Sequence, residues 1–131
     1  GAACGATLQG PVLQVLEHSA GVALGDGASY TTRSATRVAT VGLGYADGVP
    51  RLLSNCGEVA VAGKRCPIVG RVSMDLTLVD VTGVAVEVGD WIEFFGPAVA
   101  VHEVAAWAQT ITYEVLTSVS SRVERRYVTG E

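Results

Sequence analysis

A tyrosine between closely spaced glycines is the residue best suited to chemistry in this sequence. Tyr45 lies within residues 41–51 (VGLGYADGVPR), where an apolar run becomes a turn. Asp47-Gly48 and the proline that follows cannot easily continue a strand, so Tyr45 should lie where a buried strand meets a loop. The glycines Gly42 and Gly44 relieve a strained backbone or let another group approach. Tyr45 is then either a turn residue covering a barrel mouth or a proton-transfer group beside a cation.

Two further polar stretches are candidates for a binding site. Met74-Asp75 opens an alternating strand after a glycine-rich approach. Either Met74 fills a core gap and Asp75 caps a turn, or backbone N–H groups at this bend face a carboxylate or phosphate. Tyr113 follows a predicted helix, and its hydroxyl either lies in water or donates to an anion.

Common catalytic motifs do not occur in the sequence. It has no Ser-His-Asp motif, no phosphate-binding loop with GKS or GKT and no HExxH pair. Its two histidines come without an acid cluster, so we expect no metal site.

The cysteines Cys4, Cys56 and Cys66 are odd in number and lack CxxC spacing, although the last two could meet across a hairpin. We interpret all three as reduced thiols of a cytoplasmic protein.

The composition predicts a globular β-rich domain. Of the 131 residues, 49% are hydrophobic and 17% charged, which supplies a core and argues against disorder. The net charge is −4 and the nine basic residues are scattered, so we expect no nucleic-acid surface. No run of about eighteen apolar residues and no basic-then-apolar leader occurs, so we expect no membrane span. The small residues at 1–6 suggest that something precedes them.

Short strands separated by turns predict a small β-barrel or sandwich with helices late in a single domain of residues 1–131. Gly63-Lys64 is a hairpin signal, and Pro50–Asn55 suggests a short helical turn. Strands are expected at 11–17, 36–43, 58–61, 66–69, 76–81, 91–95 and 122–128.

Helical spacing begins only near residue 101. Apolar residues recur on one face of a helix predicted at 102–109, and a second helix is predicted at 113–118. The predicted apolar face consists of Val101, Val104, Ala105, Ala108 and Ile111.

Earlier in the chain, Tyr30–Arg33 is polar, so we expect it to form a loop on the surface.

Taken in order, several blocks resemble the carboxy-terminal domain of alanine racemase. The order and spacing match over roughly residues 8 to 128, which is more specific than any single motif. The blocks are GYADG at 44–48 with PR at 50–51, GKRCPIVGRVSMD at 63–75, VDVT at 79–82, VGD at 88–90, TITYEVL at 110–116 and RVERRY at 122–127.

This resemblance implies a mainly β, barrel-like domain that follows an amino-terminal (β/α)8 barrel absent from this chain. In that family the barrel holds pyridoxal phosphate as a Schiff base on a lysine. The enzyme is a cytoplasmic head-to-tail homodimer in which each carboxy-terminal domain completes the other subunit's active site. It interconverts L- and D-alanine, an isomerase reaction that supplies D-alanine for peptidoglycan and the cell wall. The isolated fragment is expected to be inactive.

The resemblance also implies roles for individual residues. Tyr45 is one of two bases and acts on the face of the substrate Cα opposite the cofactor lysine. Met74 contributes its backbone near the substrate carboxylate, and Tyr113 hydrogen-bonds the cofactor phosphate. Residues expected along the access channel are Arg71, Asp75 and Ile111.

Some positions depart from the family pattern. The only lysine, Lys64, stands at a predicted hairpin tip, so the cofactor lysine and the groups that tune Tyr45 are expected upstream. Val49 replaces an aromatic residue that the family often has after Gly48. Tyr113 favours the alanine enzyme over a serine-preferring relative. The alternatives are a non-catalytic binding module on the same fold, and a serine or broader-specificity racemase domain.

Overall fold

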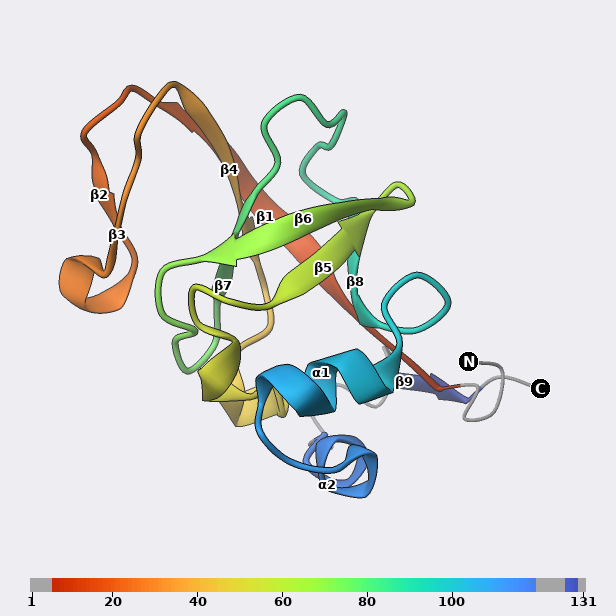
Figure 1. Ribbon diagram of the computed structural model, residues 1–131. Coiled ribbons are helices and arrows are strands. Elements are labelled where there is room, and N and C mark those ends of the chain that lie inside the picture. Colours follow the sequence, from red (N-terminus) through yellow and green to blue (C-terminus); the bar gives the residue numbers. More distant parts are fainter. Residues whose placement is uncertain (1–5, 120–126, 130–131) are drawn as a thin grey trace.

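Within the residues that the computed structural model describes, 6–119 and 127–129, six strands close into a barrel (Figure 1). Around the barrel, β1 pairs with β4, then follow β7, β6, β5 and β8, which pairs again with β1. This confirms the predicted mainly β, barrel-like fold. The strands are β1 (Ala6–His18), β4 (Thr36–Val41), β5 (Glu58–Val61), β6 (Lys64–Val69), β7 (Thr77–Asp80) and β8 (Trp91–Phe95).

The long strand β1 closes the barrel because it pairs with two different neighbours. Its first half pairs with β8 and its second half with β4, all antiparallel. The register shifts between Leu8 and Gln9 and again between Val12 and Gln14. Such irregularities bend a strand and increase its twist, which lets one strand serve both edges of the sheet.

A further short strand, β9 (Tyr127–Thr129), pairs with the start of β1 on the edge opposite β8. It overlaps the end of the strand predicted at 122–128. The remainder of that predicted strand, with Arg122, Arg125 and Arg126, lies outside the described residues, as does Cys4.

The barrel interior is filled by the inward-facing residues of each strand. On β7, Thr77 and Val79 are buried while Leu78 and Asp80 are partly exposed, which confirms the predicted alternation. The hairpin between β5 and β6 turns at Gly63, whose φ of 79° suits the predicted glycine turn. The largest fully buried side chains include Leu8, Leu53, Ile92, Phe94 and Phe95.

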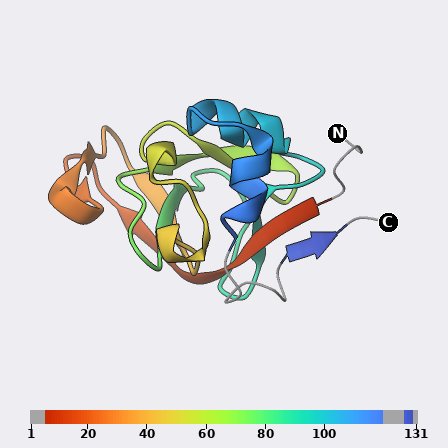
Figure 2. The same ribbon diagram turned by 90° about the horizontal axis from the view of Figure 1, so that it is seen from below.

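Helices α1 (Val101–Trp107) and α2 (Thr112–Thr117) lie together at one end of the barrel (Figure 2). Val104, Ala105 and Ala108 are buried, as the helical spacing predicted. Ile111 does not belong to this face: it is 66% exposed. The reason is that Gln109 has a φ of 59°, which ends the helical path before Ile111 is reached.

A two-stranded hairpin projects from the side of the barrel (Figure 1). It consists of β2 (Ala23–Leu24), the 3₁₀ turn η1 (Asp26–Ala28) and β3 (Tyr30–Thr31). The predicted surface loop at 30–33 is therefore partly wrong. Thr32 is buried, because its hydroxyl donates to the carbonyl of Ser19 at 2.7 Å and accepts from the N–H of Val22 at 2.9 Å.

The two described cysteines are free thiols in different environments. Cys56 is exposed, whereas Cys66 is buried in β6. Burial raises the pKa of the Cys66 thiol, and the negative charges of Asp80 and Glu58 raise it further. Among the described residues, no helix combines the length and the apolar character needed to cross a bilayer.

Leu8→Ala and Leu16→Ala test the barrel core as a matched pair on β1. Leu8 is 1% exposed and Leu16 is 46% exposed. Leu8→Ala leaves a cavity and should lower the free energy of unfolding by about 2–5 kcal/mol. Leu16→Ala should change it by about 0.5 kcal/mol. Urea denaturation followed by circular dichroism measures both, and equal losses would contradict this account of the core.

Alkylation should distinguish the two cysteines. At pH 8, iodoacetamide should modify Cys56 much faster than Cys66, because the latter is buried and its pKa is raised. Peptide mass spectrometry after timed quenching measures both rates. In urea the rates should become similar, which serves as the control. Comparable rates in the folded chain would show that Cys66 is accessible.

Candidate functional site

Tyr45 begins a tight turn in the loop that follows β4, as the sequence predicted. The 3₁₀ turn η2 spans Tyr45–Asp47. Asp47 is buried, and its carboxylate accepts a hydrogen bond from the N–H of Gly44 at 3.0 Å. The Thr77 hydroxyl donates to the carbonyl of Leu43 at 2.7 Å, which ties the start of the turn to β7. The backbone on either side of Tyr45 is therefore held by buried polar contacts.

The bend at residues 73–74 packs directly against this turn. The N–H of Tyr45 donates to the carbonyl of Ser73 at 3.0 Å, and the N–H of Ala46 donates to the carbonyl of Met74 at 2.9 Å. A Cβ at Gly44 would lie 2.2 Å from the Ser73 oxygen and 2.5 Å from the Met74 oxygen. The glycine is needed here for space, since its φ of −145° is ordinary extended backbone.

The end of α2 packs against the other side of the same loop. Gly48 has a φ of 109°, a left-handed conformation that favours glycine. A Cβ there would lie 2.6 Å from the carbonyl oxygen of Ser118. The Tyr45 loop is thus held between the 73–74 bend and the last turn of α2.

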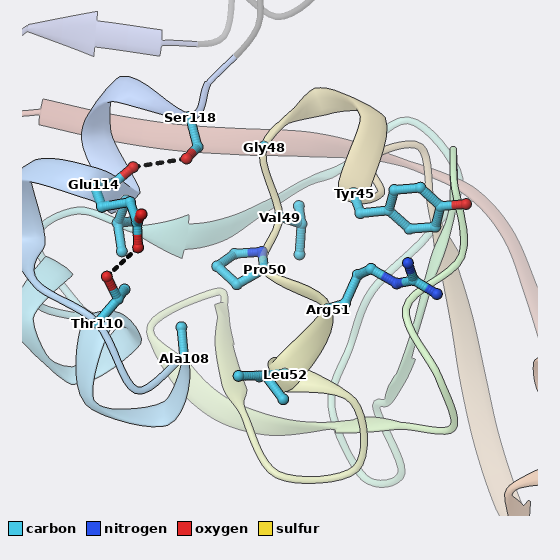
Figure 3. A pocket seen from close by; sticks show the side chains of 11 residues that line it. Tyr45, Gly48, Val49, Pro50, Arg51, Leu52, Ala108, Thr110, Glu114 and Ser118 are labelled. Atoms are coloured by element: carbon cyan, nitrogen blue, oxygen red, sulfur yellow. Dashed lines mark hydrogen bonds between the residues drawn. The ribbon is translucent and has the colours of Figure 1, made fainter.

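A cation lies against the Tyr45 ring. The Arg51 guanidinium carbon is 4.6 Å from the ring centroid, a cation–π arrangement. Figure 3 shows the Arg51 side chain beside the ring, with the Tyr45 hydroxyl pointing away from the neighbouring cavity. Tyr45 is 37% exposed. Sequence reasoning hypothesised a cation at this tyrosine but did not identify Arg51.

Beside the contact between Gly48 and Ser118, a pocket of about 370 Å³ opens between residues 45–52 and residues 108–118 (Figure 3). Its walls are mostly apolar, with a polar side formed by α2 and the residues before it. There the Thr110 hydroxyl donates to the Glu114 carboxylate, and the Ser118 hydroxyl donates to the Glu114 backbone carbonyl at 2.7 Å. The lining residues are Tyr45, Gly48, Val49, Pro50, Arg51, Leu52, Ala108, Thr110, Glu114, Val115 and Ser118.

Met74 presents its side chain to solvent and its backbone to the Tyr45 loop. The Met74 side chain is exposed, so the hypothesis that it fills a gap in the core is wrong. Ser73 closes the bend, because both its N–H and its hydroxyl donate to the carbonyl of Leu76 at 3.0 Å. Asp75 lies exposed within this closed bend.

The exposed Arg71 side chain lies against the projecting hairpin. Gly27, with a φ of 70°, leaves room for the guanidinium: a Cβ there would lie 2.9 Å from Nη1 of Arg71. The preceding Gly70 donates its N–H to the side-chain oxygen of Asn55 at 2.6 Å, and Asn55 donates to the Ser29 hydroxyl at 3.2 Å. The hairpin and the loop after η3 (Arg51–Leu53) therefore fix the start of the 70–75 segment together.

Tyr113 and Ile111 stand at the start of α2 and face outward. Tyr113 is 72% exposed, which places its hydroxyl in water in this chain. Neither residue lines the cavity, although the adjacent Glu114 does. Tyr45 and Met74 are thus brought into contact through their loops, whereas Tyr113 and Ile111 form a separate exposed group. Within the part of the chain that the structure describes, no three His, Cys, Asp or Glu side chains gather as a metal site.

Comparison with known proteins decides the family. The family profile for the alanine racemase C-terminal domain matches residues 5–127. The chain belongs to this family. It is 46% identical over 121 residues to the alanine racemase of Deinococcus radiodurans, covering 92% of this chain and 34% of that protein. It is 47% identical over 120 residues to that of Alteromonas mediterranea, covering 91% and 34%. The chain therefore spans about a third of the length of these relatives.

Solved structures of family members share the barrel. Alanine racemase from Bartonella henselae, with covalently bound pyridoxal phosphate, aligns with a TM-score of 0.84 and 41% identity over 87% of this chain and 32% of its own. The enzyme from Acinetobacter baumannii aligns with a TM-score of 0.85 and 39% identity over 88% of this chain and 33% of its own. The resemblance inferred from the sequence motifs is thereby confirmed.

Gly44→Ala tests how the tyrosine loop is held. The added methyl group would overlap the carbonyls of Ser73 and Met74, so the loop and the bend must separate. We expect a loss of about 1–3 kcal/mol in the free energy of unfolding. Amide hydrogen exchange at Tyr45 and Ala46 should accelerate, because those N–H groups donate to the displaced carbonyls.

Gly42→Ala is the matched control, two residues away. The nearest atoms to a Cβ there belong to the flexible end of the exposed Leu13 side chain, at 3.2 Å, and to the ring of Pro11, at 3.4 Å. The Gly42→Ala variant should leave the rate of amide hydrogen exchange at Tyr45 unchanged. Equal exchange in both variants would show that close approach at Gly44 does not position the loop.

Proposed function

We propose that this chain is the carboxy-terminal part of a pyridoxal-phosphate-dependent alanine racemase that interconverts L- and D-alanine. The observation that carries the proposal is Tyr45, held at an exposed rim by backbone contact with the Met74 bend in a member of this family. A (β/α)8 barrel would precede this chain in the full protein. The free thiols of Cys56 and Cys66 support a reducing, cytoplasmic location, where D-alanine is made for the cell wall.

The residues present fit one contact to pyridoxal phosphate but cannot hold the cofactor alone. Lys64, the only lysine, is exposed at the start of β6 in the β5–β6 hairpin, which is a solvated position and not a pocket. Tyr113 offers an exposed hydroxyl donor that suits a phosphate oxygen. The bound cofactor would supply an electron sink for the negative charge that forms when the substrate Cα loses its proton.

Racemisation requires two proton carriers on opposite faces of the substrate Cα. A proton leaves from one face and another is delivered to the other face, so one group cannot easily do both. Tyr45 is the carrier that this chain provides through its phenolic oxygen. The hydrogen bonds to Ser73 and Met74 fix the backbone from which that oxygen projects, which limits the orientations it must search. The Met74 backbone, at the same junction, would lie near the substrate carboxylate.

The exposed site residues support a site shared with another subunit. Tyr45, Met74, Ile111 and Tyr113 are all large apolar or aromatic residues exposed on this chain. Exposed apolar surface of this kind often marks a site where another protein or a ligand binds. We propose a head-to-tail homodimer in which they contact the partner's barrel, with Arg71, Asp75 and Ile111 along the access channel.

Tyr45→Phe in the product of the complete reading frame tests the proposal. The change keeps the ring and removes the proton carrier, so kcat for racemisation should fall by about 100-fold or more. Conversion of L-alanine to D-alanine, followed by a coupled D-amino-acid oxidase assay, measures it. Cofactor absorbance should be unchanged, because Tyr45 is not proposed to bind the phosphate.

Tyr30→Phe is the control, since Tyr30 lies in β3 outside the proposed site. It should leave turnover unchanged. A substrate panel that includes serine separates the alanine enzyme from broader-specificity relatives. A folded wild-type protein that racemises no amino acid would instead identify a binding module that kept the fold.

A further inference from the structure

Arg51 is a residue near the proposed base to which no role is assigned above. We propose that it is a positioning residue for Tyr45: its charge over one ring face holds the ring and stabilises negative charge that develops on the phenolic oxygen during proton transfer. This inference rests on the proposed function of Tyr45. It adds a cation supplied by this chain itself.

The first support is the contact. The guanidinium carbon lies 4.6 Å from the ring centroid, within the range of a cation–π interaction. A guanidinium is planar and weakly hydrated, so it covers an aromatic face better than an ammonium group does. Figure 3 shows the Arg51 guanidinium beside the Tyr45 ring, and the Tyr45 side chain remains 37% exposed with this contact in place.

The second support is the rigidity of the segment that joins the two residues. Tyr45 belongs to η2 and Arg51 begins η3, the next turn. Between them, Val49 is fully buried, and Pro50 has its φ restricted to −62°. On the far side of Arg51, Leu53 is also fully buried. The backbone that carries Arg51 is therefore anchored in the core on both sides.

The third support is chemical. In the direction of the reaction in which Tyr45 gives its proton to the substrate Cα, its contact with the cation changes from an ion facing the quadrupole of a neutral ring to an ion facing a full negative charge. The second interaction is the stronger one, so Arg51 stabilises the state that forms during proton transfer more than the resting state. In that direction, a group with this differential effect should act on kcat more than on KM.

Substitutions of Arg51 in the full-length enzyme separate charge from shape. Arg51→Met removes the charge and should lower kcat about tenfold in the direction in which Tyr45 donates its proton, with KM changed less than about twofold, so racemisation is measured from both L- and D-alanine. Arg51→Lys keeps the charge and should recover part of that loss. Arg51→Gln keeps a planar group without charge and should resemble Arg51→Met. Arg33→Gln removes an exposed positive charge elsewhere and should leave kcat unchanged.

Nuclear magnetic resonance of the 131-residue chain provides a test that does not depend on activity. Nuclear Overhauser effects should connect the Arg51 side chain to the Tyr45 ring, and Arg51→Met should shift the Tyr45 ring resonances. Absence of both effects would overturn the inference.

The kinetic outcomes are equally decisive. An active enzyme that loses turnover in Tyr45→Phe but keeps full kcat in both directions in Arg51→Met would overturn the role of Arg51 and leave the proposed function intact. Full activity in Arg51→Gln would overturn the role of charge. Activity that survives Tyr45→Phe would instead overturn the proposed function, whatever the Arg51 variants do.

Discussion

The close approach between Gly44 and the carbonyls of Ser73 and Met74 is the constraint on which the rest of the site depends. Any side chain at Gly44 would occupy the space of those oxygens. Because the two segments touch, the N–H groups of Tyr45 and Ala46 find acceptors that are not part of a strand ladder. These hydrogen bonds join the tyrosine loop to the bend at residues 73–74. They thereby set the position of the proposed proton carrier relative to the proposed carboxylate-binding backbone.

The barrel explains why these two segments meet. Strands β4 and β7 are neighbours, and their register pairs Val41 with Thr77. The turn that follows Val41 and the bend that precedes Thr77 therefore emerge at the same end of the barrel. Segments about thirty positions apart in the sequence become adjacent because two strands pair, which is a consequence of topology and not of either loop's own sequence. Function is placed on loops, and their precision comes from the strands beneath them.

Local patterns were sufficient to predict most strands, the hairpin at Gly63 and the alternation around Val79, because these features depend on neighbouring residues. They were insufficient where distant segments decide the outcome. The double pairing of β1 requires bends at two register shifts, and no local period encodes it. Ile111 fits the spacing of the helical face, but the left-handed backbone of Gln109 ends the helix first. The sequence motifs that contain the site residues could be matched to the family from the sequence alone. The contacts between those motifs could be identified only from the folded structure.

Arg51 illustrates why an electrostatic partner is harder to infer than a motif. Six positions separate it from Tyr45, a spacing that favours contact in neither a helix nor a strand. The contact arises because Gly48 reverses the chain in a left-handed conformation and Pro50 directs it into a new turn. The backbone conformations of Gly48 and Pro50 thus bring Arg51 onto the Tyr45 ring, although their spacing in the sequence does not predict this contact. The family resemblance led us to expect the groups that tune Tyr45 upstream of this chain. Arg51 lies in the turn that follows the tyrosine, so part of the environment of the proposed base can be studied in this domain.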